Sequence, residues 1–180
     1  TIATASLFTS LVIDAQEDRA IQTFDVPGAY LHAKLPKDKR VLLKLVGEFV
    51  DIMCKVNPAY LPYVRYEFGK KVLYLRVLKA IYGMIESALL WYELFSTTLE
   101  KMGFEINPYD KCVANKIIEG TQCTVCWYVD DNKVSHVDDT VNDMIVDKVE
   151  EKFGELARSK GKKHTFLGMD IEFIGNGKLT

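Results

Sequence analysis

Acidic residues follow two strand-like segments of this sequence. Asp25 ends the run Ile21–Asp25 and precedes Pro27-Gly28, and Asp130 and Asp131 lie between two apolar runs. If these strands are neighbours in one sheet, their carboxylates form an oxygen-rich site of the kind that Mg²⁺ prefers. Carboxylates on rigid backbone can hold two ions ~3.5–4 Å apart, the arrangement that serves phosphoryl and nucleotidyl transfer. A plain hairpin turn is the alternative, since Asp-Asp-Asn is ordinary turn chemistry.

The cysteines offer a second possible chemistry. Cys123 and Cys126 form a C-x-x-C, but no second pair lies at zinc-binding spacing. Both belong to a strand-like run, in which an offset of three residues directs the two thiols to opposite faces. We therefore expect buried cysteines rather than a zinc or redox site, and a reduced, intracellular setting.

Composition narrows the class of protein. The chain has 180 residues, of which 48% are hydrophobic and 27% are charged, which is ordinary for a folded globular protein and excludes a disordered tail or a disulfide scaffold. No apolar run approaches the ~18 residues that cross a bilayer, and no signal stretch opens the chain. A formal net charge of -2 argues against binding nucleic acid by bulk electrostatics.

Helices and strands alternate along the chain in an α+β pattern. The periodicity predicts helices over Ala3–Asp18, Ser87–Met102 and Thr140–Phe153, the last opening at Thr140 as a capping box. Their expected inward residues are Leu7, Leu11, Val12 and Ala15; Leu90, Trp91, Leu94, Phe95, Leu99 and Met102; and Val141, Met144, Ile145 and Val149. Strands are predicted at Ala20–Asp25, Val41–Leu45, Val72–Val77, Val113–Glu119, Thr121–Val129 and Asn132–Val137, with a strand pair around Phe166–Ile174.

Segments spread over nearly the whole chain resemble, in the right order, a copia-type (LTR retrotransposon) reverse transcriptase. They are Phe24-Asp-Val-Pro-Gly-Ala-Tyr-Leu31, Leu78-Lys-Ala-Ile-Tyr-Gly-Met84 continuing to Trp91, Gly103-Phe104 with Asp110, Tyr128-Val-Asp-Asp131 and Phe166-Leu-Gly-Met-Asp-Ile171. The resemblance implies an RNA-directed DNA polymerase with a right-hand palm: an antiparallel sheet packed on helices, with a partial fingers excursion. It divides the chain into palm (1–32), fingers-like excursion (33–84) and palm (85–180).

The family's two-metal chemistry is implied for the carboxylates. Asp25, Asp130 and Asp131 would be catalytic and would coordinate two Mg²⁺ ions, or Mn²⁺ as a substitute, with the Val26 carbonyl as a further ligand. One ion would activate the primer 3′-hydroxyl for attack on the nucleotide α-phosphate, and the other would neutralise the leaving pyrophosphate.

The resemblance also implies substrate contacts. Gly28, Ala29, Tyr30 and Gly83 would bind the nucleotide, and Tyr128, Phe166, Leu167 and Gly168 would lie near the primer. Tyr30 would collide with a ribose 2′-hydroxyl and so select deoxynucleotides; a half-buried core aromatic is the alternative. Lys160, Lys162 and Lys163 are either a proton donor to pyrophosphate or, as we expect, a solvated basic turn.

Implied partners are an RNA or DNA template with its primer, deoxynucleoside triphosphates, and the thumb, RNase H and integrase domains of a polyprotein. The implied location is intracellular, in a cytoplasmic virus-like particle or the nucleus. No membrane contact is expected.

The sequence departs from the family at Ile85-Glu-Ser-Ala-Leu89, where Lys-Gln-Ala-Pro-Arg is usual. It begins at Thr1 without the basic fingertip strand and ends without a thumb, so we expect an excised piece that alone holds primer-template poorly. One alternative is a decayed retroelement fragment without activity, at most a weak nucleic-acid-binding module. Another is a Mg²⁺-dependent phosphoesterase that uses the same carboxylates.

Overall fold

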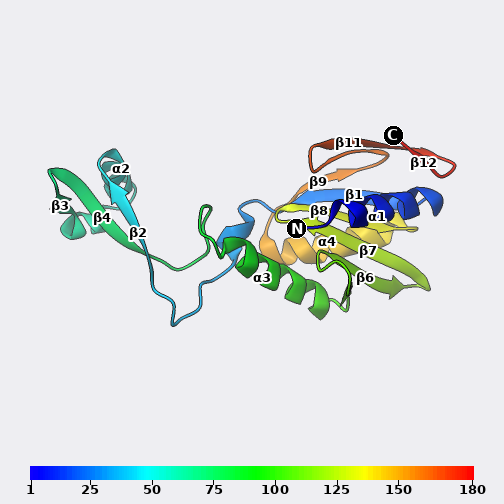
Figure 1. Ribbon diagram of the computed structural model, residues 1–180, viewed down its shortest axis with the longest axis horizontal. Helices are drawn as coiled ribbons and strands as arrows, with labels where there is room; N and C mark the ends of the chain where they lie inside the picture. The colour runs from blue at the N-terminus through cyan, green and yellow to red at the C-terminus, as the bar shows by residue number, and fades with distance from the viewer.

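A six-stranded antiparallel sheet forms the centre of the main body in the computed structural model, which describes residues 1–180. Its strand order is β5-β6-β7-β8-β1-β9 (Figure 1). The strands are β1 (Ala20–Asp25), β5 (Glu105–Ile106), β6 (Val113–Ile118), β7 (Thr121–Tyr128), β8 (Asp131–His136) and β9 (Ala157–Lys160). The predicted α+β class with an antiparallel sheet is thus confirmed. β1, from the start of the chain, lies between two strands from its last third.

Helices cover both faces of this sheet. α3 (Ser87–Lys101) and α4 (Asp139–Phe153) lie on one face, where Trp127 of β7 packs edge-on against Phe95 with ring centroids 5.5 Å apart. α1 (Thr4–Gln16) lies on the other face, where Lys133 of β8 forms an ion pair with Asp14. Because side chains alternate along a strand, Trp127 and Lys133 belong to opposite faces, and the sheet is buried on both.

Three predictions about the helices were wrong in detail. Val12 of α1 is 48% exposed, because the inward face carries Ser10 and Asp14, which Lys133 binds. Met144 of α4 is 39% exposed, because the inward face is rotated towards Asn142, whose amide donates to the Ala20 carbonyl at 2.9 Å. The N-cap of α4 is Asp138, not Thr140: its carboxylate accepts from the Thr140 N–H at 2.9 Å.

The end of the chain forms a small antiparallel sheet of β10 (Lys163–Phe166), β11 (Met169–Gly175) and β12 (Lys178–Leu179), which confirms the predicted strand pair. Figure 1 shows β11 and β12 beside β9 and α1. Phe166, Ile171 and Phe173 join the main hydrophobic core. This small sheet therefore packs beside α1 on one face of the main sheet, where His164 of β10 contacts the Thr23 hydroxyl of β1.

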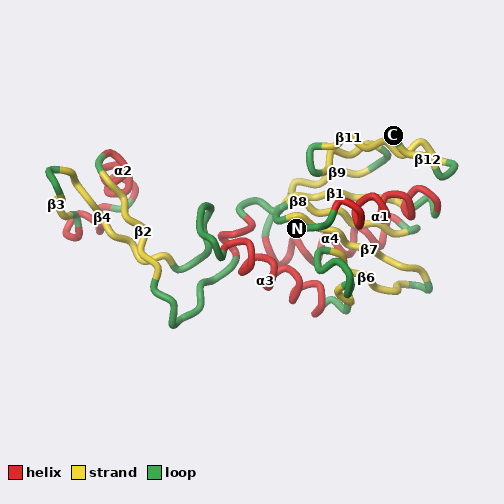
Figure 2. The backbone as a smooth tube through the Cα atoms, in the orientation of Figure 1, coloured by secondary structure: helices red, strands yellow, loops and turns green.

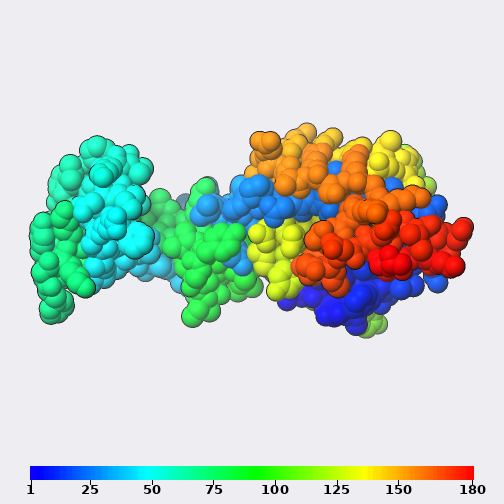
Figure 3. All heavy atoms as spheres, turned by 90° about the horizontal axis from the view of Figure 1, so that it is seen from above, coloured from blue at the N-terminus to red at the C-terminus, as the bar shows by residue number.

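A small lobe extends away from the main body. It contains β2 (Val41–Val46), α2 (Glu48–Val56), the 3₁₀ helix η2 (Pro58–Tyr63), β3 (Arg65–Glu67) and β4 (Lys70–Val77), with strand order β2-β4-β3. Val50, Cys54 and Leu73 form its separate core. Figure 2 shows that mainly loop segments join the lobe to the body, and Figure 3 shows the narrow waist between the two masses.

The two connecting segments run side by side near the body. The Leu35 N–H donates to the Leu78 carbonyl at 3.1 Å, and the Ala80 N–H donates to the Ala33 carbonyl at 2.8 Å. A short 3₁₀ helix, η1 (Ala29–His32), precedes the first segment. This pairing brings the chain after Ala80 back beside the end of β1.

The cysteines are buried and free, as predicted, and Cys123 and Cys126 lie on opposite faces of β7. Burial raises the pKa of the Cys123 thiol to about 12, which makes it a poor nucleophile at neutral pH. None of the helices has both the length and the apolar character that a membrane crossing requires.

Candidate active site

Strand pairing brings the predicted carboxylates together. Asp25 and Asp131 are Cα partners at the end of the β1–β8 ladder, and the Val26 N–H donates to the Asp130 carbonyl at 3.2 Å. The acidic residues of two distant sequence segments therefore lie at one end of the sheet. The register is fixed by the different side chains on the two buried faces, because a slip of one residue would move Lys133 from its ion pair with Asp14 to the face packed by Trp127 and Phe95.

A strained turn carries Asp130. Val129, which connects β7 to this turn, has φ +56°, a left-handed conformation that is unfavourable for a β-branched residue. Such strain persists only where the surrounding structure enforces it, and it concentrates at functional sites. Here the Val129 carbonyl accepts a hydrogen bond from the Trp91 indole at 2.6 Å.

Burial and neighbouring negative charge raise the affinity of Asp25 and Asp131 for protons. Partial burial raises the pKa of Asp25, and the charges of Asp130 and Asp131 raise it further. Burial and the Asp130 charge likewise raise the pKa of Asp131. None of these carboxylates forms an ion pair with a basic side chain, although Arg158 lines the same cavity as Asp25 and Asp131. This excess of negative charge on hard oxygen ligands suits a divalent cation.

The side chains are not gathered into a finished metal site. No group of three His, Cys, Asp or Glu side chains lies close enough to hold one metal ion. Val26 and Ala29 are fully buried, so neither residue presents a backbone atom at the surface. Their roles as a metal ligand and a nucleotide contact remain predictions that require a local rearrangement.

Two tyrosines lie beside the carboxylates. Gly28, at φ +63°, begins the short helix η1 that carries Tyr30. Tyr30 packs against Tyr82 with ring centroids 4.8 Å apart and an interplanar angle of 58°. Tyr82 is 60% exposed, and its pKa is raised by desolvation and by the charges of Asp130, Tyr30 and Asp25.

Tyr82 is not among the predicted nucleotide-binding residues, although the adjacent Gly83 is one of them. The signal was present, because the segment Leu78–Met84 contains an aromatic residue directly before that glycine. Gly83 has φ +89° and turns the chain immediately after Tyr82. The pairing of the two connecting segments is what brings Tyr82 back to Tyr30.

A cavity of about 210 Å³ connects the carboxylates to the C-terminal hairpin. Its walls include Asp25, Asp131, Thr165 and Phe166. Leu167 and Gly168, at φ +52° and +74°, form the turn between β10 and β11. The structure thus brings Phe166 to the carboxylates, with Leu167 and Gly168 directly after it. Tyr128 precedes the strained turn and is 41% exposed.

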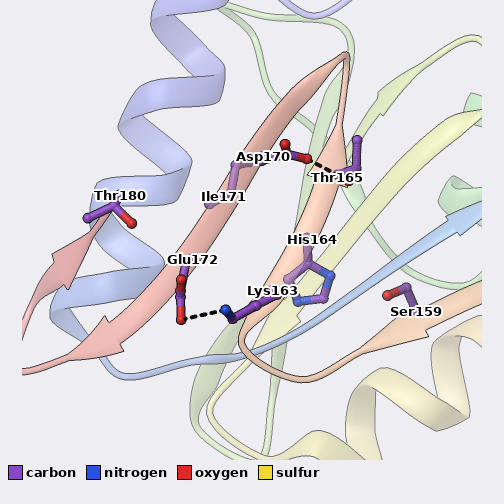
Figure 4. Close-up of a pocket in the computed structure, with 8 residues that line it drawn as sticks. All are labelled: Ser159, Lys163, His164, Thr165, Asp170, Ile171, Glu172 and Thr180. Atoms are coloured by element: carbon purple, nitrogen blue, oxygen red, sulfur yellow. Dashed lines mark hydrogen bonds and ion pairs between the residues drawn. The ribbon is translucent and has the colours of Figure 1, made fainter.

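A neighbouring cavity of about 410 Å³ lies along β10 and β11 (Figure 4). Its polar side chains bond to one another: Lys163 contacts Glu172 at 3.2 Å, and Thr165 donates to Asp170 at 2.8 Å. His164 contacts the Thr23 hydroxyl at 3.2 Å, and burial lowers its pKa. These pairs stabilise the hairpin, and the carboxylates of the strand ends do not line this cavity.

Several basic side chains near the site are already paired with acids. Lys160 forms ion pairs with Asp139 and Asp143 of α4, which favours a structural role over proton donation. Arg158 reaches Asp147 at 2.6 Å. Glu86, at the departure from the family sequence, pairs with Lys39 of the first connecting segment.

Comparisons with known proteins identify the family of this chain. The sequence profile of the family described as "Reverse transcriptase (RNA-dependent DNA polymerase)" matches residues 2–179. The Gag-Pol polyproteins of transposons Ty1-MR1 and Ty1-BR of Saccharomyces cerevisiae are each 24% identical over 174 residues. These alignments cover 93% of this chain, which spans 8% of the length of those relatives.

Among solved structures, an apo telomerase from Candida tropicalis truncated from its C-terminal domain has a similar fold. The TM-score is 0.51 at 12% identity, over 100% of this chain and 40% of that one. The profile match over residues 2–179 and the similarity to the copia-type Ty1 polyproteins agree. The chain belongs to the reverse transcriptase (RNA-dependent DNA polymerase) family, as a fragment of its copia type.

Proposed function

We propose that this chain is the catalytic core of an RNA-directed DNA polymerase that transfers nucleotides to a primer 3′-hydroxyl. In this proposal residues 1–32 and 85–180 are the palm and residues 33–84 are a partial fingers region. The observation that carries it is the pairing of Asp25 with Asp131, which gathers carboxylates from two distant segments with no basic partner.

Asp25, Asp130 and Asp131 would hold two Mg²⁺ ions, or Mn²⁺ in their place. The donor set fits, because it consists of hard oxygens without basic partners, and burial followed by neighbouring carboxylate charge raises the pKa of Asp25 and Asp131. The Val26 carbonyl would join after a local rearrangement. Bound there, such ions supply Lewis-acid stabilisation of phosphoryl oxygens.

The chain's own residues position the substrates. The Tyr30 ring supports the incoming sugar, and its contact with Tyr82 limits the space beside the 2′ position. The turn at Gly28 and the flexible backbone at Gly83 allow close approach of the triphosphate, with Ala29 joining once exposed. Tyr128 and the turn Phe166-Leu-Gly168 flank the primer end.

The partners in this proposal are a primed RNA or DNA template, deoxynucleoside triphosphates and the other domains of a Gag-Pol-type polyprotein. Its setting is inside the cell, in a cytoplasmic virus-like particle or in the nucleus. The net charge of -2 leaves little bulk electrostatic attraction for nucleic acid, so the thumb and other domains contribute much of the affinity for the primed template.

Primer extension on an RNA template with Mg²⁺ tests the proposal, in this chain and in a longer form of the protein. Asp130→Asn should lower incorporation by more than about 100-fold, beyond the loss typical of outer-shell substitutions. Asp18→Asn is the matched control, because it removes the same charge at the far end of β1, roughly 20 Å away. Asp18 has φ +48°, which Asn tolerates.

Extension that is equally strong with Asp130→Asn contradicts the proposal. If neither form shows any Asp130-dependent extension, the chain is instead a folded but inactive retroelement fragment, at most a weak nucleic-acid binder. Asp130-dependent hydrolysis of phosphoesters without primer or template would favour the phosphoesterase.

A further inference from the structure

The backbone around Asp130 is held from two sides by buried side chains. Trp91 of α3 is 1% exposed, and its indole N–H donates to the Val129 carbonyl at 2.6 Å. Asn132 of β8 is fully buried, and its amide donates to the Asp130 carbonyl and, at 3.3 Å, to the Phe24 carbonyl. The residues on both sides of the Val129–Asp130 peptide are therefore bonded to neighbouring elements.

Asn132 also connects the two carboxylate segments. Phe24 directly precedes Asp25, so a single amide bonds to the chain beside Asp25 and to Asp130 itself. The Val26 N–H donates to the same Asp130 carbonyl at 3.2 Å. The distance between the two segments is thus set by these bonds as well as by the ladder.

Trp91 counteracts the strain of the turn. A left-handed valine is strained, so the turn relaxes unless the surrounding structure holds it. In this conformation the Val129 carbonyl accepts the 2.6 Å hydrogen bond from the Trp91 indole, and relaxation of the turn would move that carbonyl. The Trp91 ring is itself fixed by Phe95 and Phe153, at centroid distances of 5.4 and 5.1 Å.

We propose that Trp91 and Asn132 are positioning residues that hold the Val129–Asp130 turn, and with it the Asp130 carboxylate, against Asp25. The inference rests on the proposed function, since it gives these residues a purpose at the divalent-cation site. Neither residue touches substrate, so both act through the backbone of the turn.

The chain contains a matched control for each residue. Trp127 is also 1% exposed and packs on Phe95, but its indole N–H has no partner. Asn142 is also fully buried, and its amide donates to the Ala20 carbonyl at the opposite end of β1. The side-chain oxygen lacks a partner in both Asn132 and Asn142. Substitution by Leu therefore removes a donating amide nitrogen and an unpartnered oxygen at each position.

Amide hydrogen exchange at Val26, followed by NMR in the 180-residue chain, tests the positioning without any metal. Trp91→Phe and Asn132→Leu should each accelerate exchange of the Val26 amide at least tenfold relative to Trp127→Phe and Asn142→Leu. Each test variant is compared with the control that carries the same substitution at a similarly buried position. Effects of reduced core packing in general are therefore common to both members of a pair. Equal exchange within both pairs overturns the proposal.

Binding of Mn²⁺, followed by the electron paramagnetic resonance of the free ion, tests the consequence for the site. Trp91→Phe and Asn132→Leu should weaken binding about 10–100-fold, as expected for groups that orient metal ligands, while the controls bind as the unaltered chain does. Unchanged Mn²⁺ affinity in both test variants overturns the positioning role.

Asp130→Asn separates this inference from the proposed function. If the unaltered chain and Asp130→Asn bind Mn²⁺ equally, the metal site of the proposed function fails. The hydrogen-exchange comparison alone then supports or overturns the positioning of the Val129–Asp130 turn by Trp91 and Asn132. If Asp130 is required for binding and the paired variants do not differ, the proposed function stands and this inference fails.

Discussion

Asp25 and Asp131 lie directly opposite each other at the end of the β1–β8 ladder, a placement in which two like charges oppose folding. Burial is the first cause that raises the pKa of each; the charges of Asp130 and Asp131 raise that of Asp25 further, and the charge of Asp130 raises that of Asp131. Their repulsion is absent well below the ordinary pKa of 3.8 and grows as pH rises through the raised values. Above the raised pKa values both carboxylates are charged, and their repulsion then lowers the stability of the metal-free fold by its full amount.

Asp131→Asn should therefore stabilise the metal-free chain at pH 7, by about 1 kcal/mol or ~2–4 °C in Tm. The gain should shrink as pH falls towards and below 3.8, where both carboxyls are protonated. Thermal unfolding in a chelator at several pH values measures it. Asp18→Asn is the control, and a Tm that falls with Asp131→Asn at pH 7 would contradict the repulsion.

Mg²⁺ should reverse that order of stability. A cation bound only by the folded state raises Tm, so the unaltered chain should gain stability with Mg²⁺ concentration while Asp131→Asn gains less. The same unfolding experiment with added MgCl₂ checks this, with NaCl at equal ionic strength as the control. An equal gain for both proteins would show that the ion binds elsewhere.

Tyr30→Ala should increase incorporation of ribonucleotides relative to deoxynucleotides, because it removes the ring beside the 2′ position. Tyr82→Ala should produce a smaller change in the same direction, since the Tyr82 ring supports Tyr30 at 4.8 Å, whereas Tyr82→Phe keeps that support. Primer extension with each nucleotide type measures the ratio. Tyr109, 97% exposed, supplies the control Tyr109→Ala, and unchanged selectivity with Tyr30→Ala would refute the gate.

The sequence allowed most of the sheet to be predicted, because β6 and β7 are rich in apolar and β-branched residues and are separated by the turn residues Glu119-Gly120. β9 was not predicted, because Ala-Arg-Ser-Lys has no apolar alternation. It is a strand because it pairs with β1 while Arg158 and Lys160 bind acids of α4. α2 was missed as well, within a segment whose prolines and charges obscured the periodicity.

The sequence indicated which residues to consider for the candidate site, but it did not indicate their geometry. The acidic strand ends indicated a cation site, yet nothing local places β1 between β8 and β9. Tyr82 depends on the pairing of two connecting segments far apart in sequence, and the hold of Trp91 on Val129 depends on α3 packing. Such long-range contacts follow from burial of the whole sheet rather than from a motif.

The buried ion pair of Lys133 with Asp14 predicts a strong asymmetry between single and double substitutions. Both side chains are 1% exposed or less, so removing Asp14 leaves Lys133 as an unpaired buried charge, and removing Lys133 leaves Asp14 only the more distant Arg19 at 3.9 Å. Either loss should cost about 3–5 kcal/mol. Lys133→Met or Asp14→Leu alone should therefore destabilise strongly. The double variant should recover much of the loss in urea unfolding, and additive losses would contradict the coupling.

An exposed ion pair provides the comparison. Asp147, 62% exposed, binds Arg158 at 2.6 Å on the surface of α4. Asp147→Asn should change the unfolding midpoint little, because exposed pairs contribute little net free energy. A large loss there would mean that the assay responds to charge removal in general rather than to burial.

Asp110, which matches the family spacing after Gly103-Phe104, anchors the start of α1. Its carboxylate accepts from the Ala3 N–H at 2.8 Å and from the Cys112 N–H at 2.9 Å. Burial alone would raise the pKa of Asp110, but these backbone hydrogen bonds outweigh it and lower the pKa. The stabilisation is therefore present above the ordinary pKa of 3.8 and is lost as pH falls through the lowered value.

Asp110→Asn should cost about 1–3 kcal/mol at pH 7, because Asn has one acceptor oxygen for two backbone donors. The difference from the unaltered chain should shrink at a pH below the lowered pKa, where Asp110 is itself protonated. Urea unfolding at pH 7 and at acid pH measures this, and exchange of the α1 amides locates it. A difference that is independent of pH would mean that the charge of Asp110 does not hold the helix.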